Sequence, residues 1–171
     1  MTDQPQITHA RELHGLDTHE RVCFYEQEFY PLSNFSAFAI YWLVHGSEVH
    51  GSEVRFDTSE ALYHWHKFPD SAALRARIRL ANSAHEAFKV AEEHRTRVRP
   101  DWNEVRVDVM RAILRTKVAQ HEYVRRKLFE TGTRELVENS WRDNFWGWGP
   151  NRDGQNMLGK LWMEIRAENW P

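Results

Sequence analysis

The chain contains one cysteine, Cys23, in 171 residues, so it cannot form a disulfide bond within itself. Proteins without disulfides are typical of reducing compartments, and we expect a cytoplasmic location. No apolar run approaches the roughly 20 residues that a membrane-spanning helix needs, and the polar residues 1–5 do not resemble a signal peptide. We therefore expect no membrane partner. Cys23 lies in the apolar run 22–25 and is predicted to be a buried strand residue, not a nucleophile.

Patterns for a metal or a nucleotide cofactor are also missing. His64 and His66 are two residues apart on a predicted helix, which turns them to different faces. No cluster of Cys and His residues offers another set of metal ligands. No glycine-rich loop follows a predicted strand and opens a helix, which excludes the Rossmann and Walker patterns. We expect neither a metal nor a cofactor, and the sequence indicates no obligate protein partner.

Net charge is small, at −2, but it is unevenly distributed. Residues 75–127 carry 14 Lys and Arg against 7 Asp and Glu. Predicted helices in this segment carry several arginines, among them Arg106, Arg111 and Arg115, which could form a basic face for phosphates or an ordinary solvated surface. The pattern is compatible with a phosphate-bearing ligand, whereas the near-neutral net charge disfavours tight binding to a nucleic-acid duplex.

The stretch 60–67 is the most informative part of the chain. In a helix, Glu60, Tyr63, His64 and Lys67 fall on one side, where a helix packed on a core would show apolar residues. Seven residues of helical rise separate Glu60 from Lys67 by about 10 Å, so that the two side chains could reach both ends of a sugar ring. The alternative is a solvated face with incidental charges.

The periodicity predicts a mainly α (α+β) fold: a flexible tail over residues 1–20, then one compact helical domain over 21–171 with a small antiparallel β portion near the N-terminus. Strands are predicted at 22–25 and 37–44, with a turn at 31–35. A tandem repeat of His-Gly-Ser-Glu-Val over residues 45–54 predicts a lengthened hairpin. A short strand is predicted at 135–138.

Helix starts are predicted from capping residues, and the segment from residue 58 onward is mostly helical. Ser83 with Glu86, and Asp101 with Glu104, have the spacing of capping boxes. The predicted starts are Thr58 or Ser59 for a helix that ends before Pro69, Asp70 for one through Leu80, Ser83, Asp101, and Asn156 for the last helix. A further helix is predicted to end near Gly132.

Three of the eight tryptophans, Trp141, Trp146 and Trp148, fall in a segment rich in glycine and proline. Such a segment is predicted to be a loop. Tryptophans on a loop either offer flat surfaces for stacking a base or anchor the loop to the core, and the sequence favours neither.

Taken together, these segments resemble the NADAR, or YbiA-like, family over residues 22–168. The resemblance rests on Phe24-Tyr25, 32–35, Thr58-Ser59-Glu60 through Lys67-Phe68, Trp102, Val109-Met110, Lys117, Leu136-Val137-Glu138, Asp143, Phe145-Trp146-Gly147, and Gly154 with Asn156 through Gly159, Met163 and Arg166. It implies a mainly helical fold with a small β portion. It also implies an N-glycosidase that cleaves the bond between a ribose anomeric carbon and a nitrogen.

The resemblance implies that Lys67 attacks the anomeric carbon and forms a Schiff base, which requires a lowered pKa so that some amine is neutral near pH 7. Glu60 would then bind ribose hydroxyls or transfer protons. In a competing mechanism Glu60 and Asp143 are a carboxylate pair that activates water and protonates the leaving nitrogen, and Lys67 only orients the substrate. The predicted catalytic residues are therefore Lys67, Glu60 and Asp143.

The predicted substrate-binding residues are Asn34, Tyr63, His64, Trp102, Glu138, Trp146, Gly147 and Asn156. Trp102 and Trp146 could sandwich a base or serve as core anchors, and Asn34 could contact the ligand or serve a turn. The family usually has Gln at the position of His64, so that recognition there is expected to differ.

The predicted function is removal of ADP-ribose from ADP-ribosylated guanine in nucleic acid, through a Schiff base on Lys67. Two alternatives stay open. One is cleavage of ribosylamine intermediates of riboflavin biosynthesis, and the other is a non-catalytic module that binds ADP-ribose or a related nucleotide, with Lys67 as a phosphate contact. The expected partners are a ribosylated base or ADP-ribose, and possible ADP-ribosylated nucleic acid.

Overall fold

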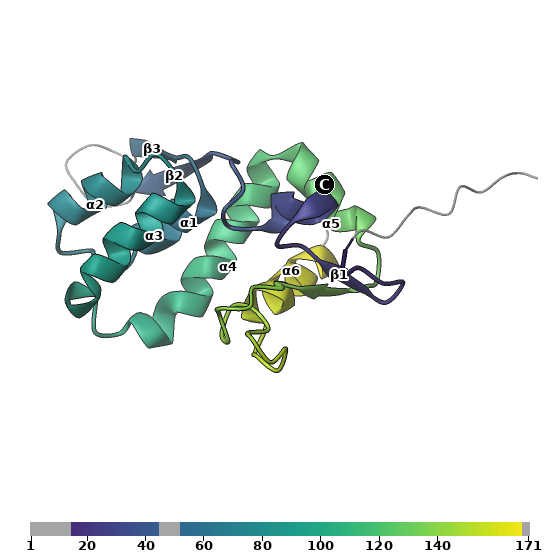
Figure 1. Cartoon of the computed structure of the whole chain (residues 1–171). Coiled ribbons are helices and arrows are strands. Elements are labelled where there is room, and N and C mark those ends of the chain that lie inside the picture. Colours follow the sequence, from purple (N-terminus) through teal and green to yellow (C-terminus); the bar gives the residue numbers. More distant parts are fainter. Residues whose placement is uncertain (1–14, 45–51, 169–171) are drawn as a thin grey trace, which may run out of the picture.

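A computed structural model describes residues 15–44 and 52–168 of the chain (Figure 1). Residues 1–14 of the predicted tail and residues 45–51 of the predicted hairpin lie outside the described residues. In chain order the elements are β1 (Arg21–Cys23), the 3-10 helix η1 (Gln27–Leu32), β2 (Ile40–Val44), β3 (Ser52–Phe56), α1 (Ser59–Trp65), α2 (Ala72–Arg79), α3 (Ala84–Glu93), the 3-10 helix η2 (Arg95–Arg97), α4 (Trp102–Gln120), α5 (Glu122–Glu130), β4 (Glu135–Val137) and α6 (Met157–Ala167).

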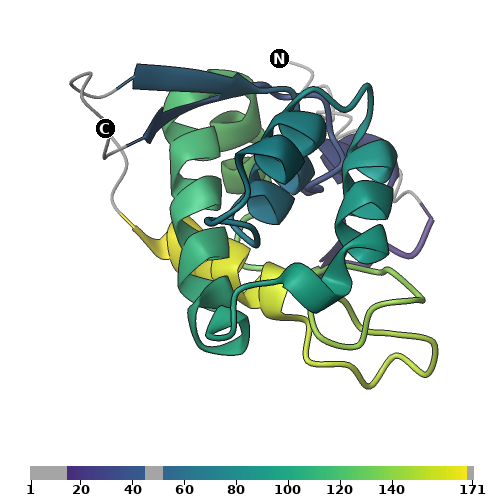
Figure 2. The same ribbon diagram turned by 90° about the vertical axis from the view of Figure 1, so that its left-hand side faces the viewer.

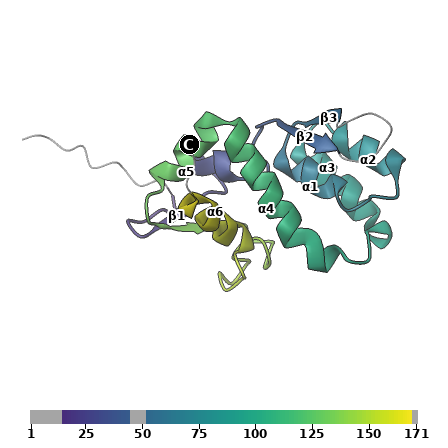
Figure 3. The same ribbon diagram turned by 180° about the vertical axis from the view of Figure 1, so that it is seen from behind.

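The long helix α4 runs through the middle of the molecule and separates two groups of elements (Figures 1 and 3). On one side, α1, α2 and α3 pack against one another, and α1 also contacts α4. On the other side, α5 and α6 pack against α4, and α6 lies along β4. The fully buried residues Met110, Ile113 and Leu114 of α4 belong to the shared core. Within the described residues, no helix is both long enough and apolar enough to cross a membrane.

Two small sheets make up the β portion. β2 and β3 pair antiparallel, with Ile40 opposite Phe56, and the second copy of the tandem repeat contributes residues 52–54 to β3. β1 and β4 pair parallel, with Val22 opposite Leu136. The predicted fold class is confirmed. The parallel pair was not predicted, and it adds to the predicted antiparallel portion. Parallel strands need a long crossover connection, which the chain from η1 to α5 provides here.

The helix starts agree with the capping residues in two cases. The Thr58 hydroxyl accepts a hydrogen bond from Ala61 N at 3.2 Å, and the Ser83 hydroxyl accepts one from Glu86 N at 3.1 Å. The helix expected from Asp70 has its cap one residue later, at Ser71, and begins at Ala72. The capping box predicted at Asp101 is wrong, because its carboxylate accepts from the Arg99 guanidinium at 2.5 and 2.7 Å and makes no cap.

The helix predicted up to Pro69 ends earlier, since α1 stops at Trp65. Lys67 follows in a turn, where its N–H donates to His64 O at 3.1 Å and its carbonyl accepts from Arg99 N at 2.9 Å. The turn is therefore tied to the segment that precedes α4. A helix that stops here leaves Lys67 at the end of α1, on the same side as Glu60 and His64.

The loop 138–156 connects β4 to α6 and projects beyond α6 (Figure 2). Asn156 begins α6 as predicted, but its side chain does not cap the helix. Instead its amide accepts from Glu138 N and donates to Leu136 O, each at 2.9 Å, and so fastens the start of α6 to the end of β4. Gly159 allows this close approach, because a Cβ there would lie 2.0 Å from Leu136 O.

Candidate active site

A cavity of about 530 Å³ lies between α1, α3, α4, the loop after η1 and the loop 138–156. The three predicted catalytic residues, Glu60, Lys67 and Asp143, all line it. So do six of the predicted substrate-binding residues: Asn34, Tyr63, His64, Trp102, Glu138 and Trp146. The fold thus gathers side chains from four separate segments around one space of the size that binds small ligands.

Gly147 and Asn156 do not line the cavity. A Cβ on Gly147 would lie 2.8 Å from Glu138 O, so this glycine allows the loop to pack on the end of β4. Asn156 holds the same place from the other side through Glu138 N. Both residues support the backbone of Glu138 and do not line the cavity, and a binding role for them stays a prediction.

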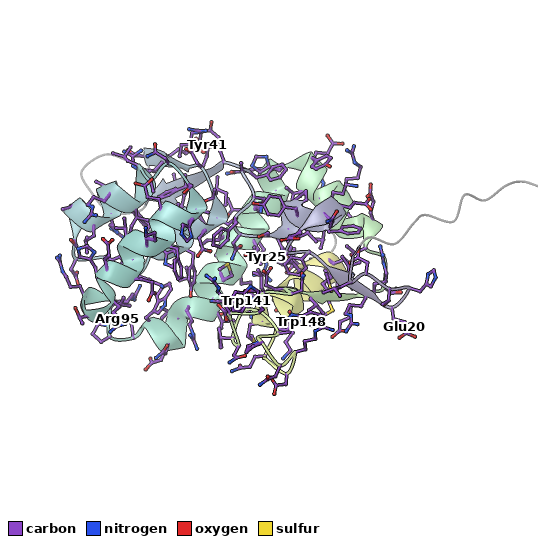
Figure 4. The ribbon with its side chains drawn as sticks, in the orientation of Figure 1. Glu20, Tyr25, Tyr41, Arg95, Trp141 and Trp148 are labelled. Carbon is purple, nitrogen blue, oxygen red and sulfur yellow. The ribbon has the colours of Figure 1, made fainter. Side chains whose placement is uncertain are left out.

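A second, more open hollow of about 670 Å³ lies beside β2 and is lined by Trp42, His66 and Arg75, among others. It contains none of the predicted site residues. Figure 4 shows Tyr25, which lines the first cavity, near the middle of the molecule, and Tyr41, which lines the hollow, at its edge. The predicted catalytic residues line the smaller cavity, and we take that cavity as the candidate active site.

Glu60 and His64 form a buried pair on α1. His64 Nε2 and Glu60 Oε1 are 2.7 Å apart, and the residues are 2% and 8% exposed. The i,i+4 spacing of one helix creates this contact. The Glu60 N–H also donates to Asn34 O at 3.1 Å, which ties the loop after η1 to the start of α1. The pair uses one oxygen of Glu60 and leaves the other carboxylate oxygen for a ligand hydroxyl.

Lys67 reaches the cavity over two aromatic rings. Its Nζ lies 5.3 Å from the centre of the Tyr63 ring and 5.8 Å from that of Trp102. Within the described residues it makes no ion pair with a carboxylate. Burial lowers the pKa of Lys67 from its ordinary value, while the charge of Glu60 opposes this shift. A lowered pKa increases the neutral, nucleophilic fraction of the amine.

An aromatic wall completes this side of the cavity. The Tyr63 ring lies 5.0 Å from the Trp102 ring and 5.5 Å from the Trp146 ring, edge-on to the latter. Trp146 Nε1 donates to the Tyr63 hydroxyl at 3.2 Å, and burial raises the pKa of that phenol. Trp146 therefore faces the site, whereas Trp148 is buried with Cys23 and Val137, and Trp141 is 61% exposed. The loop tryptophans include both a cavity wall and an anchor.

Asp143 organises the loop that carries Trp146. Its Oδ1 accepts hydrogen bonds from Phe145 N and Trp146 N, both at 2.7 Å. This arrangement is a side-chain turn within the loop. Asp143 lines the cavity as predicted, yet one of its two oxygens is already used to shape the wall.

Glu138 lines the cavity with 6% of its surface exposed, and Lys117 of α4 is fully buried. Burial raises the pKa of Glu138 to about 8, and the charges of Glu60 and Asp143 add to the effect. Burial lowers the pKa of Lys117 to about 7, against the opposing charge of Glu138. Lys117 Nζ donates to Ser33 O at 2.9 Å and to Ser36 Oγ at 2.8 Å, next to Asn34. A pKa of about 8 favours the protonated form of Glu138, which lines the site, near neutral pH.

The sequence and the fold of this chain are similar to those of known proteins. A sequence model of the NADAR domain matches residues 23–170. The chain belongs to the NADAR family. N-glycosidase Npun_R5314 of Nostoc punctiforme is 35% identical over 151 residues, which cover 86% of this chain and 91% of that protein. The NMR structure of Escherichia coli YbiA superposes with a TM-score of 0.72 at 31% identity, over 92% of this chain and 89% of that one.

A longer relative contains a similar segment. Riboflavin biosynthesis protein VVA0006 of Vibrio vulnificus is 39% identical over 111 residues, which cover 65% of this chain. The chain spans 30% of the length of that protein. The NADAR segment is thus found both in relatives of similar length and as a part of a larger protein.

Two further residues were named in the sequence analysis but not among the predicted site residues, Arg106 as part of a possible basic face and Lys117 as part of the family resemblance. Arg106 lines the cavity one helical turn after Trp102, and Lys117 lies in the apolar stripe with Ile113 and Leu114. The i,i+4 spacing from Trp102 was the available signal for Arg106. A lysine among apolar residues on one helix face was the signal for Lys117.

Proposed function

We propose that this NADAR chain is an N-glycosidase in which the Lys67 amine attacks the anomeric carbon of a ribose bound to a nitrogen base. The observation that carries the proposal is the environment of Lys67: an amine of lowered pKa over the rings of Tyr63 and Trp102, in a cavity with Glu60. A desolvated lysine without a carboxylate partner is suited to nucleophilic attack. The N-glycosidase name of the Nostoc relative supports the same reaction class.

The chemistry follows in three steps. The Nζ–C1 bond forms as the bond between C1 and the base nitrogen breaks, and the base leaves with a proton from an acid. The ring C1–O4 bond then opens, O4 takes the proton that nitrogen loses, and a Schiff base joins C1 to Lys67. Water adds to C1 and the C1–Nζ bond breaks, which releases the sugar. The extra proton left on the Lys67 nitrogen returns to the carboxylate that protonated the base, so that the neutral amine and the acid are both restored. No external oxidant or reductant is needed.

The described side chains offer a group for each part of this sequence. Glu138 carries a proton near neutral pH and is the acid that we assign to the leaving nitrogen. Glu60, fixed by His64, binds the ribose hydroxyls. Trp146 and Trp102 flank the base. The competing mechanism, a Glu60 and Asp143 pair that activates water, would have to use an Asp143 side chain already bonded to two backbone N–H groups.

Two substrate classes deserve testing in a fixed order. A ribosylamine of the kind formed in riboflavin biosynthesis comes first, because a relative is named for that process. ADP-ribosylated guanine comes second, because cationic Arg106 and Arg142 line the cavity and suit a phosphate-bearing substrate. The cavity volume of about 530 Å³ suits a sugar, a base and a phosphate group.

The test is release of the base from each substrate, followed by mass, with and without borohydride. We expect turnover and, with borohydride, a covalent adduct on the peptide that contains Lys67. Lys67→Ala should abolish the adduct and the turnover while binding is retained. Lys89→Ala, at an exposed lysine of α3, is the matched control and should behave like the wild type.

Other outcomes are equally informative. Turnover without any adduct would replace the Schiff base by the carboxylate mechanism. Binding of ADP-ribose without turnover of either substrate would make the chain a nucleotide-binding module, with Lys67 as a phosphate contact.

A further inference from the structure

Among the described residues, Arg106 is one of two arginines, with Arg142, that line the cavity and take no part in the three steps above. Trp102, Arg106 and Met110 are spaced four residues apart on α4, and all three line the cavity. Residues at this spacing form one stripe on a helix. Arg106 therefore faces the same space as Lys67, whose Nζ lies over the Trp102 ring.

The structure separates Arg106 from the other arginines of α4. Arg111 pairs with Glu164 at 2.8 Å, and Arg115 pairs with Glu168 at 2.6 Å, so that both join α4 to α6. Within the described residues, Arg106 has no carboxylate partner. A half-buried guanidinium that lacks an acidic partner inside the protein is available to an anion brought by a ligand.

The Arg106 side chain is also held in a defined orientation. Its Cζ lies 3.5 Å from the centre of the Phe145 ring, so that the guanidinium stacks on that ring. Its Nε is buried and has no hydrogen-bond partner in the described part of the chain. Stacking fixes the plane of the guanidinium, and in the described part of the chain none of its nitrogens has a hydrogen-bond partner. An arginine held in this way can bind two oxygens of a phosphate through its terminal nitrogens.

The spacing along α4 matches a phosphorylated ribose. Trp102 and Arg106 are four residues apart, so their backbone positions differ by about 6 Å along the axis of α4. The ring of Trp102 is one of the two rings near Lys67 Nζ. The ribose C1 would lie at Lys67, and the substituent on C5 would point toward Arg106. We propose that Arg106 binds the phosphate attached to C5 of the substrate ribose, and this assignment rests on the N-glycosidase function proposed above.

The phosphate can belong to a ribose 5-phosphate monoester or to the diphosphate of ADP-ribose. The test is calorimetric binding of ribose, ribose 5-phosphate and ADP-ribose to the wild type and to Arg106→Gln. Loss of a charged hydrogen-bonded pair should weaken binding of the phosphorylated probes by about 10- to 100-fold and leave ribose unchanged. Equal wild-type affinity for the two phosphorylated probes indicates the monoester, and a tighter ADP-ribose complex indicates the diphosphate.

Two further variants make the result decisive. Arg106→Lys keeps the charge without the fork of N–H groups and should show an intermediate loss. Arg111→Gln removes a surface arginine of the same helix and should bind all probes like the wild type. Wild-type affinity of Arg106→Gln for ribose 5-phosphate, or equal binding of ribose and ribose 5-phosphate by the wild type, would overturn the assignment. Absence of base release with phosphate-dependent binding intact would overturn the glycosidase proposal alone.

Discussion

At the scale of single residues, the site depends on polar groups that satisfy one another out of contact with bulk water. Glu60 is the clearest case, because a carboxylate that is 8% exposed on a helix otherwise buried needs a hydrogen-bond donor. His64 supplies it from the next turn of α1. The family resemblance predicts Gln at this position, and a Gln amide can donate the same hydrogen bond.

We therefore predict opposite results for two substitutions of His64. His64→Leu removes the donor and leaves the Glu60 carboxylate without its partner, which should lower the free energy of unfolding by about 2 kcal/mol. His64→Gln keeps a donor and should cost less than about 1 kcal/mol. Urea denaturation followed by tryptophan fluorescence measures both. Equal losses in the two variants would show that the hydrogen bond to Glu60 is not what stabilises this part of α1.

At the scale of elements, the sequence predicts features that depend on residues close together in the chain, such as helix caps. Thr58 and Ser83 cap helices because the hydroxyl and its N–H partner are three residues apart. Asp101 has the same spacing to Glu104, but Arg99 lies two residues away and takes the carboxylate. The parallel pairing of β1 with β4 depends on residues far apart in the chain, for which local periodicity carries no signal.

The two potential caps should differ in stability measurements. Ser83→Ala removes a hydrogen bond to the first turn of α3 and should lower the free energy of unfolding by about 1 kcal/mol. Asp101→Ala removes no cap and should cost less than Ser83→Ala. Thermal unfolding of both variants under one set of conditions compares them. A larger loss for Asp101→Ala would mean that its carboxylate supports α4 after all.

Packing of α6 on β4 gives a second prediction at this scale. In Gly159→Ala the new Cβ would meet Leu136 O at 2.0 Å, which forces the helix away from the strand. The expected loss is about 3 kcal/mol or more. Gly132→Ala is the matched control, because its φ is +60° but no atom lies within 4 Å of the Cβ, so only backbone strain of about 1 kcal/mol is expected. Similar losses would contradict the close approach.

At the scale of the whole molecule, the candidate site is formed by side chains from several distant segments, and local sequence patterns predict it only in part. Of the eleven site residues predicted from the polar face of 60–67 and the family resemblance, nine line the cavity. Gly147 and Asn156 lie outside the lining and support the backbone, because a glycine or an asparagine in a motif can serve the backbone as well as a ligand. Arg106 and Arg111 look alike in the sequence, and only the position of α6 pairs the second with Glu164.

The enclosed groups Glu138 and Lys117 are also a property of the assembled molecule. Glu138 follows β4 and Lys117 belongs to α4, so their burial depends on segments that are distant in the sequence and pack together in the fold. Burial favours the neutral form of each group: it raises the pKa of Glu138 to about 8 and lowers the pKa of Lys117 to about 7. Each shift links the stability of the fold to pH.

The sign of the Glu138 effect follows from its raised pKa. The folded protein holds a proton on Glu138 up to about pH 8, whereas the unfolded chain releases it near the ordinary value of 4.5. The folded state binds more protons on Glu138 in between, so the contribution of Glu138 to stability is greatest below about pH 4.5 and falls as the pH rises to 8. We predict that Glu138→Gln removes this fall, so that its free energy of unfolding gains on the wild type by on the order of a few kcal/mol between pH 5 and 8.

Urea denaturation at half-unit pH steps measures this difference, with the wild type and Glu138→Gln in parallel. Glu135→Gln, at an exposed glutamate of the neighbouring strand, is the control for loss of one carboxylate and should follow the wild type. Parallel curves for the wild type and Glu138→Gln would mean that Glu138 is ionised in the folded protein. It could not then protonate the leaving base near neutral pH, because that step needs a carboxylic acid that keeps its proton there.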